Sequence, residues 1–419
     1  MKCLVFVIGV ALFVTGVAGF AVAAFDTIPL PHLNLVGFVT ISGISSGADV
    51  AAMWHIANSD ITNGSAIFAG QAPGCAIMRM DKESQFGCAE QPAGGKGPGC
   101  VGMPWGSAKC IGCDGSETLQ YDHCKTIDGA PLTQLPRLLD YYKSLESMGS
   151  IPPLSNLIDD AVYLYHGIKD MTYNIPSVNN TADFFNEIGI SMSRISFEAQ
   201  VPSGHCWPTA DIMIPSTTCG VSSPLYPAIE NCGYDGAGAA LFQIMGGQNT
   251  LKKPANISDF EIASLFTFLQ SPFDRPGQWA GQGRLGYIYI PRACVNNGSS
   301  SSSGSSCRLH IALHGCGMSA SNPAMGTQFV QHTGLNAWAE TNQIVILYPQ
   351  MGGFIDFNIT APSNQLQGGC FDGYGQSGSD YAHTSGPQMV AIRKMVEQLY
   401  GGLEGFKRAG LTNVWERGG

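Results

Sequence analysis

The strongest constraint on the fold is a Gly-x-Ser-x-Gly pentapeptide that lies between an apolar run and a helical pattern. The pentapeptide covers residues 43–47 and has Ser45 at its centre. Residues 35–41 before it indicate a buried strand, and residues 48–57 after it have the periodicity of a helix. A strand, a sharp turn and a helix in this order place the serine at a helix N-terminus, where developing negative charge is stabilised. We therefore predict that Ser45 is a nucleophile; the alternative is an ordinary glycine turn.

The composition indicates a globular chain with a sparsely charged surface. Of the 419 residues, 44% are hydrophobic and only 12% are charged, and the net charge is −10. A negative net charge makes nucleic acid an unfavourable partner, whereas a neutral or weakly polar substrate suits such a surface. Residues 1–23 have the pattern of a secretory signal, with Lys2 at the positive end and an A-x-A site at 21–23. The alternative is a membrane anchor, and no other run is long and apolar enough to span a bilayer.

Cysteines and glycosylation motifs also favour export. The chain has 14 cysteines, and 13 remain when Cys3 is removed with the signal. Most should pair in an exported protein, but an odd number leaves at least one free or paired with another molecule. Asn-x-Ser/Thr motifs, which indicate a glycoprotein if the source is eukaryotic, begin at Asn63, Asn179, Asn256, Asn297 and Asn358. We expect a secreted, extracellular protein, or a periplasmic one if the source is bacterial.

Strands and helices alternate along the chain, which predicts an α/β fold with a mostly parallel sheet and helices on both faces. Further strands are predicted at 65–70, 161–165, 195–201, 286–291, 309–313 and 344–348. Further helices are predicted at 132–148, 181–188, 237–245, 261–269, 328–340 and 388–400. We expect residues 24–419 to form a single catalytic domain with a cysteine-rich insert at about 83–125.

Disulfides are a better interpretation of the cysteine motifs than metal sites. Cys110 and Cys113 in the insert have the spacing of a zinc or redox motif, but no second pair of suitable spacing exists. A Ser/Gly run at 298–306 has the composition of a flexible segment. We interpret it as a long hairpin loop closed by Cys294 and Cys307; a domain linker is the alternative.

Two residues that follow later strands complete a candidate catalytic set with Ser45. A serine hydroxyl needs a base to take its proton, and the base needs a carboxylate to orient it. Asp170 comes just after the strand at 161–165, and His205 comes just after the strand at 195–201. The order Ser, Asp, His and the loop positions are those of α/β-hydrolases. We therefore predict Asp170 as the orienting acid and His205 as the base.

Other acids and histidines compete for these roles. Asp159 and Asp160 precede their strand, so we expect them at the opposite edge of the sheet. His166 and His314 also lie at strand ends. His205 is preferred by its position in the chain order.

The oxyanion donors are predicted in an unusual order along the chain. One backbone N–H should come from Ser46, which follows the nucleophile, and the other from a His-Gly loop after a neighbouring strand that normally precedes it. Here such a loop, 313–317, lies far downstream of His205. The prediction is that Cys316 is the second donor and that the chain is circularly permuted, with the first strands of the sheet last in sequence. The alternative is a glycine turn that happens to contain a histidine.

Taken together, these motifs resemble the secreted, single-domain, circularly permuted poly(3-hydroxybutyrate) depolymerases. The matching stretches span nearly the whole mature chain and are 43–47, 163–170, 204–209, 313–317, 369–372 and 385–388. The resemblance implies an α/β-hydrolase fold, a triad of Ser45, Asp170 and His205, and an oxyanion donor at Cys316. It also implies disulfides between Cys316 and Cys370 and between Cys219 and Cys232.

The resemblance further implies a serine esterase that cleaves poly(3-hydroxybutyrate), related short-chain polyesters or oligomeric hydroxyalkanoates, with no metal or organic cofactor. Members of the family often have a tryptophan-rich stretch where this chain has Phe371-Asp-Gly-Tyr374. Trp207, Tyr374 and His314 are our candidates for substrate contact, and a place in the core is the alternative for Trp207 and Tyr374. The alternative functions are a feruloyl or acetyl xylan esterase on the same fold and a catalytically silent binding protein.

Overall fold

The computed structural model covers the parts of the chain that form the sheet and its helices. It describes residues 25–74, 135–170, 173, 175–211, 217–220, 228–246, 250–276, 280–295, 306–352, 369–373, 377–378 and 380–411. The predicted signal at 1–23, the predicted insert at 83–125 and Tyr374 lie outside these residues. Among the described residues, no helix combines the length and apolar character needed to cross a bilayer.

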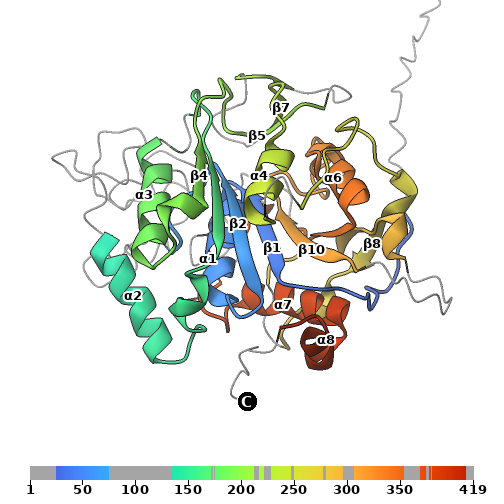
Figure 1. Cartoon of the computed structure of the whole chain (residues 1–419). Coiled ribbons are helices and arrows are strands. Elements are labelled where there is room, and N and C mark those ends of the chain that lie inside the picture. Colours follow the sequence, from blue (N-terminus) through green and yellow to red (C-terminus); the bar gives the residue numbers. More distant parts are fainter. Residues whose placement is uncertain are drawn as a thin grey trace, which may run out of the picture.

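An eight-stranded sheet forms the centre of the protein, in the order β4-β3-β2-β1-β10-β11-β9-β8 (Figure 1). Its strands are β1 (Val39–Ile44), β2 (Thr62–Phe68), β3 (Ala161–Tyr165), β4 (Ile195–Glu198), β8 (Leu265–Leu269), β9 (Leu285–Tyr289), β10 (Arg308–Leu313) and β11 (Ile344–Tyr348). Every pair from β4 to β11 is parallel, and β9 and β8 add antiparallel strands at one edge. The predicted mostly parallel sheet is confirmed.

The strand order shows that the sheet is permuted along the chain. Thr40 pairs with His310 and Gly43 with Leu313, so β10 lies directly beside β1 although it comes late in the sequence. Read from the other edge, the order is β8-β9-β11-β10-β1-β2-β3-β4, and the last strands of the chain occupy the first half of the sheet. The predicted circular permutation explains this arrangement.

Helices cover both faces of the sheet (Figure 1). One face packs against α1 (Ser46–Ala57), α2 (Leu135–Ser147), α3 (Ile175–Glu187), α7 (Pro387–Tyr400) and α8 (Gly402–Arg408). The other packs against α4 (Gly236–Ile244), α5 (Gln328–His332) and α6 (Leu335–Asn342). In β3, Val162 and Leu164 point into the first core, and Tyr163 and Tyr165 into the second, as the alternation of strand side chains requires.

A second, smaller sheet lies beyond the end of the central strands (Figure 1). It consists of β5 (Cys206–Thr209), β6 (Thr217–Thr218) and β7 (Ala228–Asn231) in the order β5-β7-β6, and both pairs are parallel. This sheet begins immediately after His205, and Ala228 at the start of β7 donates its N–H to the His205 carbonyl, so the small sheet helps to hold that residue.

Two predicted helices are wrong in part. Residues 261–269 form a 3₁₀ turn, Ile262–Ser264, followed by strand β8, because the run Leu265–Leu269 pairs antiparallel with β9. A short apolar run fits both the helical and the strand periodicity, and here the pairing with β9 makes it a strand. The helix predicted at 328–340 is split into α5 and α6 by Gly334, whose φ of 88° lies in the left-handed region.

Candidate active site

Ser45 occupies the turn between β1 and α1 in a conformation that side chains rarely adopt. Its φ is 56° and its ψ is −126°, although it is not a glycine. Its backbone N–H donates to the carbonyl of Phe68 at the end of β2, and its own carbonyl accepts from Ala48 and Asp49 in the first turn of α1. The serine hydroxyl makes no capping bond to the helix. The turn is therefore fixed by the backbone, and the hydroxyl is left for another purpose.

Two glycines allow this turn to pack closely. A Cβ atom at Gly43 would overlap the backbone of Gly47, and one at Gly47 would overlap the carbonyl oxygens of Leu313 and His314. The second overlap places the end of β10 and the loop after it against the serine turn. The predicted loop at 313–317 and Ser45 thus lie at the same edge of the sheet.

The predicted base and the predicted acid lie within hydrogen-bond distance of each other. The Nδ1 atom of His205 lies 2.9 Å from Oδ2 of Asp170, and both side chains are buried. Within the described part of the chain, Nε2 of His205 has no hydrogen-bond partner. Because Nδ1–H donates to the carboxylate, Nε2 carries the lone pair of a neutral imidazole and can take a proton.

Hydrogen bonds between loops hold this pair at the edge where Ser45 lies. Ala69, directly after β2, donates its N–H to the carbonyl of Tyr165 at the end of β3. In the next loops, Ile168 donates to Val201 and Lys169 donates to Ser203. The carboxyl ends of parallel strands share one edge, so these bonds align the loops of Ser45, Asp170 and His205 along it.

Tyr173 is a site residue that sequence analysis missed. Its backbone N–H donates to Oδ1 of Asp170 at 3.1 Å, and its ring stacks on the His205 imidazole with 5.5 Å between ring centroids. Its hydroxyl donates to Oδ2 of Asp49 at 2.9 Å. A tyrosine in a loop carries no motif, so no local pattern could have identified it.

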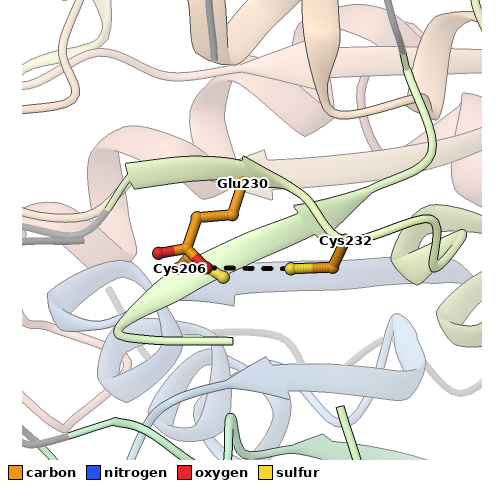
Figure 2. Close-up of side chains that lie close together, drawn as sticks. All are labelled: Cys206, Glu230 and Cys232. Carbon is orange, nitrogen blue, oxygen red and sulfur yellow. Dashed lines mark hydrogen bonds between the residues drawn. The ribbon is translucent and has the colours of Figure 1, made fainter. Parts of the chain in front are cut away.

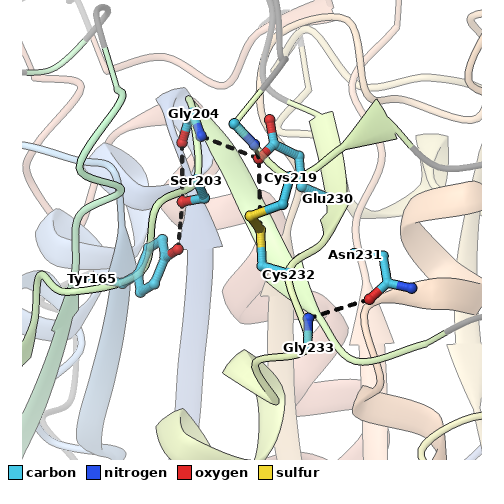
Figure 3. The surroundings of a disulfide bond; sticks show 9 residues. Tyr165, Ser203, Gly204, Cys219, Glu230, Asn231, Cys232 and Gly233 are labelled. Atoms are coloured by element: carbon cyan, nitrogen blue, oxygen red, sulfur yellow. Dashed lines mark hydrogen bonds between the residues drawn. A yellow bond between two sulfur atoms is a disulfide. The ribbon is translucent and has the colours of Figure 1, made fainter.

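The small sheet fixes the loop that carries His205 (Figure 3). Glu230, in β7, is fully buried, and its Oε2 atom accepts the N–H of Gly204 at 3.1 Å and that of Gly220 at 2.6 Å. A disulfide between Cys219 and Cys232 flanks this carboxylate. Glu230 therefore ties Gly204, the residue before His205, to two separate segments of the small sheet.

A potential metal-binding cluster lies in the same place (Figure 2). The ligand atoms of Cys206, Glu230 and Cys232 lie within 4.8 Å of one another. However, Cys232 is bonded to Cys219, and burial raises the pKa of the Cys206 thiol well above its usual value. Neither sulfur is thus available as a thiolate, which is the form that binds metals.

The loop after β10 is tied to the serine turn. Cys316 is bonded to Cys370, and the next residue, Phe371, donates its N–H to the hydroxyl of Ser46 at 3.3 Å. Cys294 and Cys307 are also bonded. All three disulfides predicted between described residues, including Cys219 with Cys232, are confirmed.

His314 supports this loop from inside and does not face a substrate, contrary to our prediction. The side chain is fully buried between the carbonyl of Gly315, 2.8 Å from Nδ1, and the N–H of Met351, 3.0 Å from Nε2. Burial lowers the pKa of His314 to about 4, so the ring is neutral and accepts from Met351.

Trp207 likewise belongs to the core and not to a substrate groove. Its ring is fully buried, stacks on Phe68 at 4.0 Å between centroids, and donates its indole N–H to the carbonyl of Thr333. The prediction of substrate contact for Trp207 is therefore wrong, because Phe68, Phe329 and Thr333 contact the ring in the core. The prediction for Tyr374 falls outside the described residues.

The competing residues have other partners. Asp160 lies before β3, at the opposite edge of the sheet, as expected, where its Oδ2 is 2.9 Å from Nε2 of His55. Nδ1 of His55 contacts the Ser65 hydroxyl at 2.8 Å, so these residues form a second Ser-His-Asp arrangement, buried in the core. His166 contacts the carbonyl of Tyr173. Hydrogen-bonded serine, histidine and aspartate alone therefore do not distinguish a site from a structural network.

Comparison with known proteins assigns the chain to a family. Over 403 residues it is 31% identical to a polyhydroxybutyrate depolymerase of Talaromyces funiculosus, and the match covers 94% of this chain and 97% of that relative. The chain belongs to the polyhydroxybutyrate depolymerase family. It is also 28% identical over 367 residues to a poly(3-hydroxybutyrate) depolymerase of Delftia acidovorans, and spans 60% of that relative's length. No protein-family model matches the chain.

Solved structures agree with this assignment to the depolymerase family. The crystal structure of a PHB depolymerase from Penicillium funiculosum is 29% identical, with a TM-score of 0.66, and covers 90% of this chain and 99% of its own. A PHB depolymerase complexed with an R3HB trimer matches with the same coverage and TM-score at 28% identity. The predicted resemblance and fold are confirmed, and the chain is an ester hydrolase of the depolymerase type.

Proposed function

We propose that the protein hydrolyses ester bonds of poly(3-hydroxybutyrate), or of oligomers of related short hydroxyalkanoates, through Ser45, His205 and Asp170. One observation carries the proposal. His205 is held by Asp170 through Nδ1, and its Nε2, which has no partner among the described residues, lies at the sheet edge that carries the strained Ser45 turn. A serine nucleophile and a base with a lone pair to take its proton are the two parts that acyl transfer needs.

In the reaction, Oγ of Ser45 bonds to the ester carbonyl carbon while Nε2 of His205 takes the hydroxyl proton. Asp170 keeps the imidazole in the tautomer that has its lone pair on Nε2, and stabilises the imidazolium that forms. His205 then returns the proton to the leaving alkoxide, which departs as an alcohol. Water, activated by the same histidine, releases the acid from the acyl-enzyme and restores the serine.

The N–H groups of Ser46 and Cys316 are proposed to bind the oxyanion of the tetrahedral intermediate. Ser46 is the first residue of α1, where backbone N–H groups have no partner within the helix. Cys316 lies in the loop whose first residues contact Gly47, and its disulfide to Cys370 fixes that loop. Two fixed donors need no reorientation as charge develops.

The substrate class follows from the family. One solved relative holds an R3HB trimer, which supports short hydroxyalkanoate oligomers as ligands of this chain. The disulfides and the signal pattern at 1–23 support secretion, and the extracellular space is where an insoluble polymer can be reached.

The direct test measures soluble hydroxybutyrate products released from polymer granules by the wild type and by Ser45→Ala. We expect product release by the wild type and none above background by the variant. Ser65→Ala is the matched control because Ser65 belongs to the buried Ser-His-Asp arrangement, and it should retain turnover. Release by Ser45→Ala equal to the wild type would overturn the assignment. Release of ferulate or of acetate from xylan, but not of hydroxybutyrate, would assign the other esterase functions.

A further inference from the structure

We propose that Tyr173 is a positioning residue that joins the base and the acid of the active site to the helix of the nucleophile, with Asp49 as its anchor. The inference rests on the proposed roles of Ser45, His205 and Asp170. Neither Tyr173 nor Asp49 takes part in the bond-making steps.

Tyr173 contacts both members of the acid–base pair. Its ring lies nearly parallel to the His205 imidazole, with an interplanar angle of 20°, and so restricts rotation of the ring out of its plane. Its backbone N–H donates to Oδ1 of Asp170, and Nδ1–H of His205 donates to Oδ2 of the same carboxylate. The carboxylate is thus held at both oxygens, and the imidazole is held at one edge and one face.

Asp49 connects this unit to the nucleophile. It lies in the first turn of α1, and its N–H donates to the carbonyl of Ser45 at 3.0 Å. Its carboxyl accepts the Tyr173 hydroxyl at Oδ2 and the N–H of Gln71 at Oδ1, at 3.2 Å. The path from Ser45 through Asp49 and Tyr173 to His205 is therefore made of one turn of helix, one hydrogen bond and one ring stack.

Such a connection matters because the nucleophile and the base lie on different elements. Ser45 is placed by β1 and α1, whereas Asp170 lies in the loop after β3 and His205 lies in the loop between β4 and β5. A displacement of about 1 Å between reacting groups can reduce a rate on the order of 100-fold. Asp49 is a fully buried carboxyl. Burial of such a group costs free energy unless hydrogen bonds offset it, and the bonds from Tyr173 and Gln71 do so here. Among the described residues, the titratable groups that interact with Asp49 are Tyr173 and Tyr381, which lies in the turn before α7.

The variants separate the hydrogen bond from the ring stack. Tyr173→Phe keeps the stack and removes the hydroxyl, and Asp49→Ala removes the acceptor. We expect each to lower kcat about tenfold with KM within about twofold, because the transition-state geometry is lost and not the binding of the ester. Asp49→Asn can still hydrogen-bond the Tyr173 hydroxyl, so it should stay close to the wild type.

A double-mutant cycle tests whether the two residues act as one unit. Tyr173→Phe combined with Asp49→Ala should be no slower than either single variant, since both cut the same connection. Tyr289→Phe is the matched control, because Tyr289 also donates to a carboxylate, Oε2 of Glu340 at 2.7 Å, but lies in β9 away from the site. It should leave kcat unchanged.

The assay is hydrolysis of p-nitrophenyl butyrate, with thermal unfolding of each variant to exclude loss of fold. Wild-type kcat in a folded Tyr173→Phe variant would overturn the inference. Losses that multiply in the double variant, or an equal loss in Asp49→Asn and Asp49→Ala, would also overturn it, since they indicate separate effects or an effect of charge. An active Ser45→Ala enzyme would instead refute the proposed function, so the two failures are distinguishable.

Discussion

At the scale of single residues, the site depends on a backbone conformation that is unfavourable by itself and is stabilised by contacts with neighbouring segments. Ser45 holds a positive φ of 56°, which costs of order 1–3 kcal/mol for a residue with a side chain. The surrounding sheet enforces it, through the bond from Ser45 to Phe68 and the contact of Gly47 with the loop after β10. The serine is thereby presented at the end of α1 and is not used to cap it.

We expect Asp170 to affect catalysis by fixing which nitrogen of His205 carries the proton. In Asp170→Asn the amide can turn its NH₂ group toward Nδ1, which would place the imidazole proton on Nε2 and remove the lone pair that accepts the serine proton. We expect kcat to fall about 10³–10⁴-fold, as in other triads. Asp160→Asn, which alters the buried contact to His55, is the control and should act on stability rather than on kcat. Comparable kcat losses in the two variants would contradict this role for Asp170.

Asp49 should make the protein less stable as pH rises. Burial raises its pKa from 3.8 to about 7, against the weaker opposite effect of the Tyr173 hydrogen bond. Between these values the folded chain holds a proton that the unfolded chain has released, so the free energy of unfolding falls as pH rises from about 4 to 7. Asp49→Asn removes this titration. Urea unfolding of both proteins across this range should show a smaller decline in the variant, and equal slopes would show that Asp49 does not titrate in this way.

At the scale of elements, the close approach of the serine turn and the loop after β10 is the contact that assembles the site. Gly47→Ala would drive a methyl group into the carbonyls of Leu313 and His314, both of which are backbone atoms that cannot turn away. We expect the variant to lose most esterase activity and to unfold at a lower temperature.

The control for this prediction separates overlap from backbone strain. Gly37 has a φ of 69° and open space around its Cβ position, so Gly37→Ala introduces strain alone, worth about 1–2 kcal/mol. Its kcat should match the wild type. Full activity in Gly47→Ala would mean that the loop at 313–317 is not held against the turn in solution.

Most elements that carry catalytic residues could be predicted from local sequence, and the errors have a common cause. The strand, turn and helix around Ser45 follow from periodicity and glycine spacing. The pattern at 261–269 fits a helix, but residues 265–269 form a strand because they pair with β9, a separate stretch of the chain. Tyr173, Asp49 and Glu230 act through partners that are distant in sequence, so no local pattern marks them.

At the scale of the whole molecule, the sheet is assembled from two parts of the chain in reversed order. The position of the His-Gly loop at 313–317, far after His205, was sufficient to predict this permutation, because the loop has to reach the serine turn. The pairing of Gly43 with Leu313 bears it out. Burial of Trp207 and His314 could not be predicted, because it depends on Phe68 and Met351, which meet these rings only in the folded chain.

Histidine–aspartate pairs occur at more than one place in the molecule, so family membership alone does not identify the site. Among the described residues, three histidine–aspartate pairs are hydrogen-bonded: His205 with Asp170, His55 with Asp160, and His332 with Asp211. A serine hydroxyl joins two of them, Ser65 at His55 and Ser258 at Asp211. The pairs of His205 and His55 lie at opposite edges of the central sheet. Only the edge that carries the ends of the parallel strands also carries the loop after β10 and the N-terminus of α1.

The most direct test of the central claim is to map the serine modified by a fluorophosphonate probe, by mass spectrometry of peptides from the intact enzyme. The account predicts a single adduct on Ser45, formed in step with loss of esterase activity and abolished in His205→Ala. An adduct on Ser65 or another serine, or an active enzyme that is fully labelled elsewhere, would contradict it.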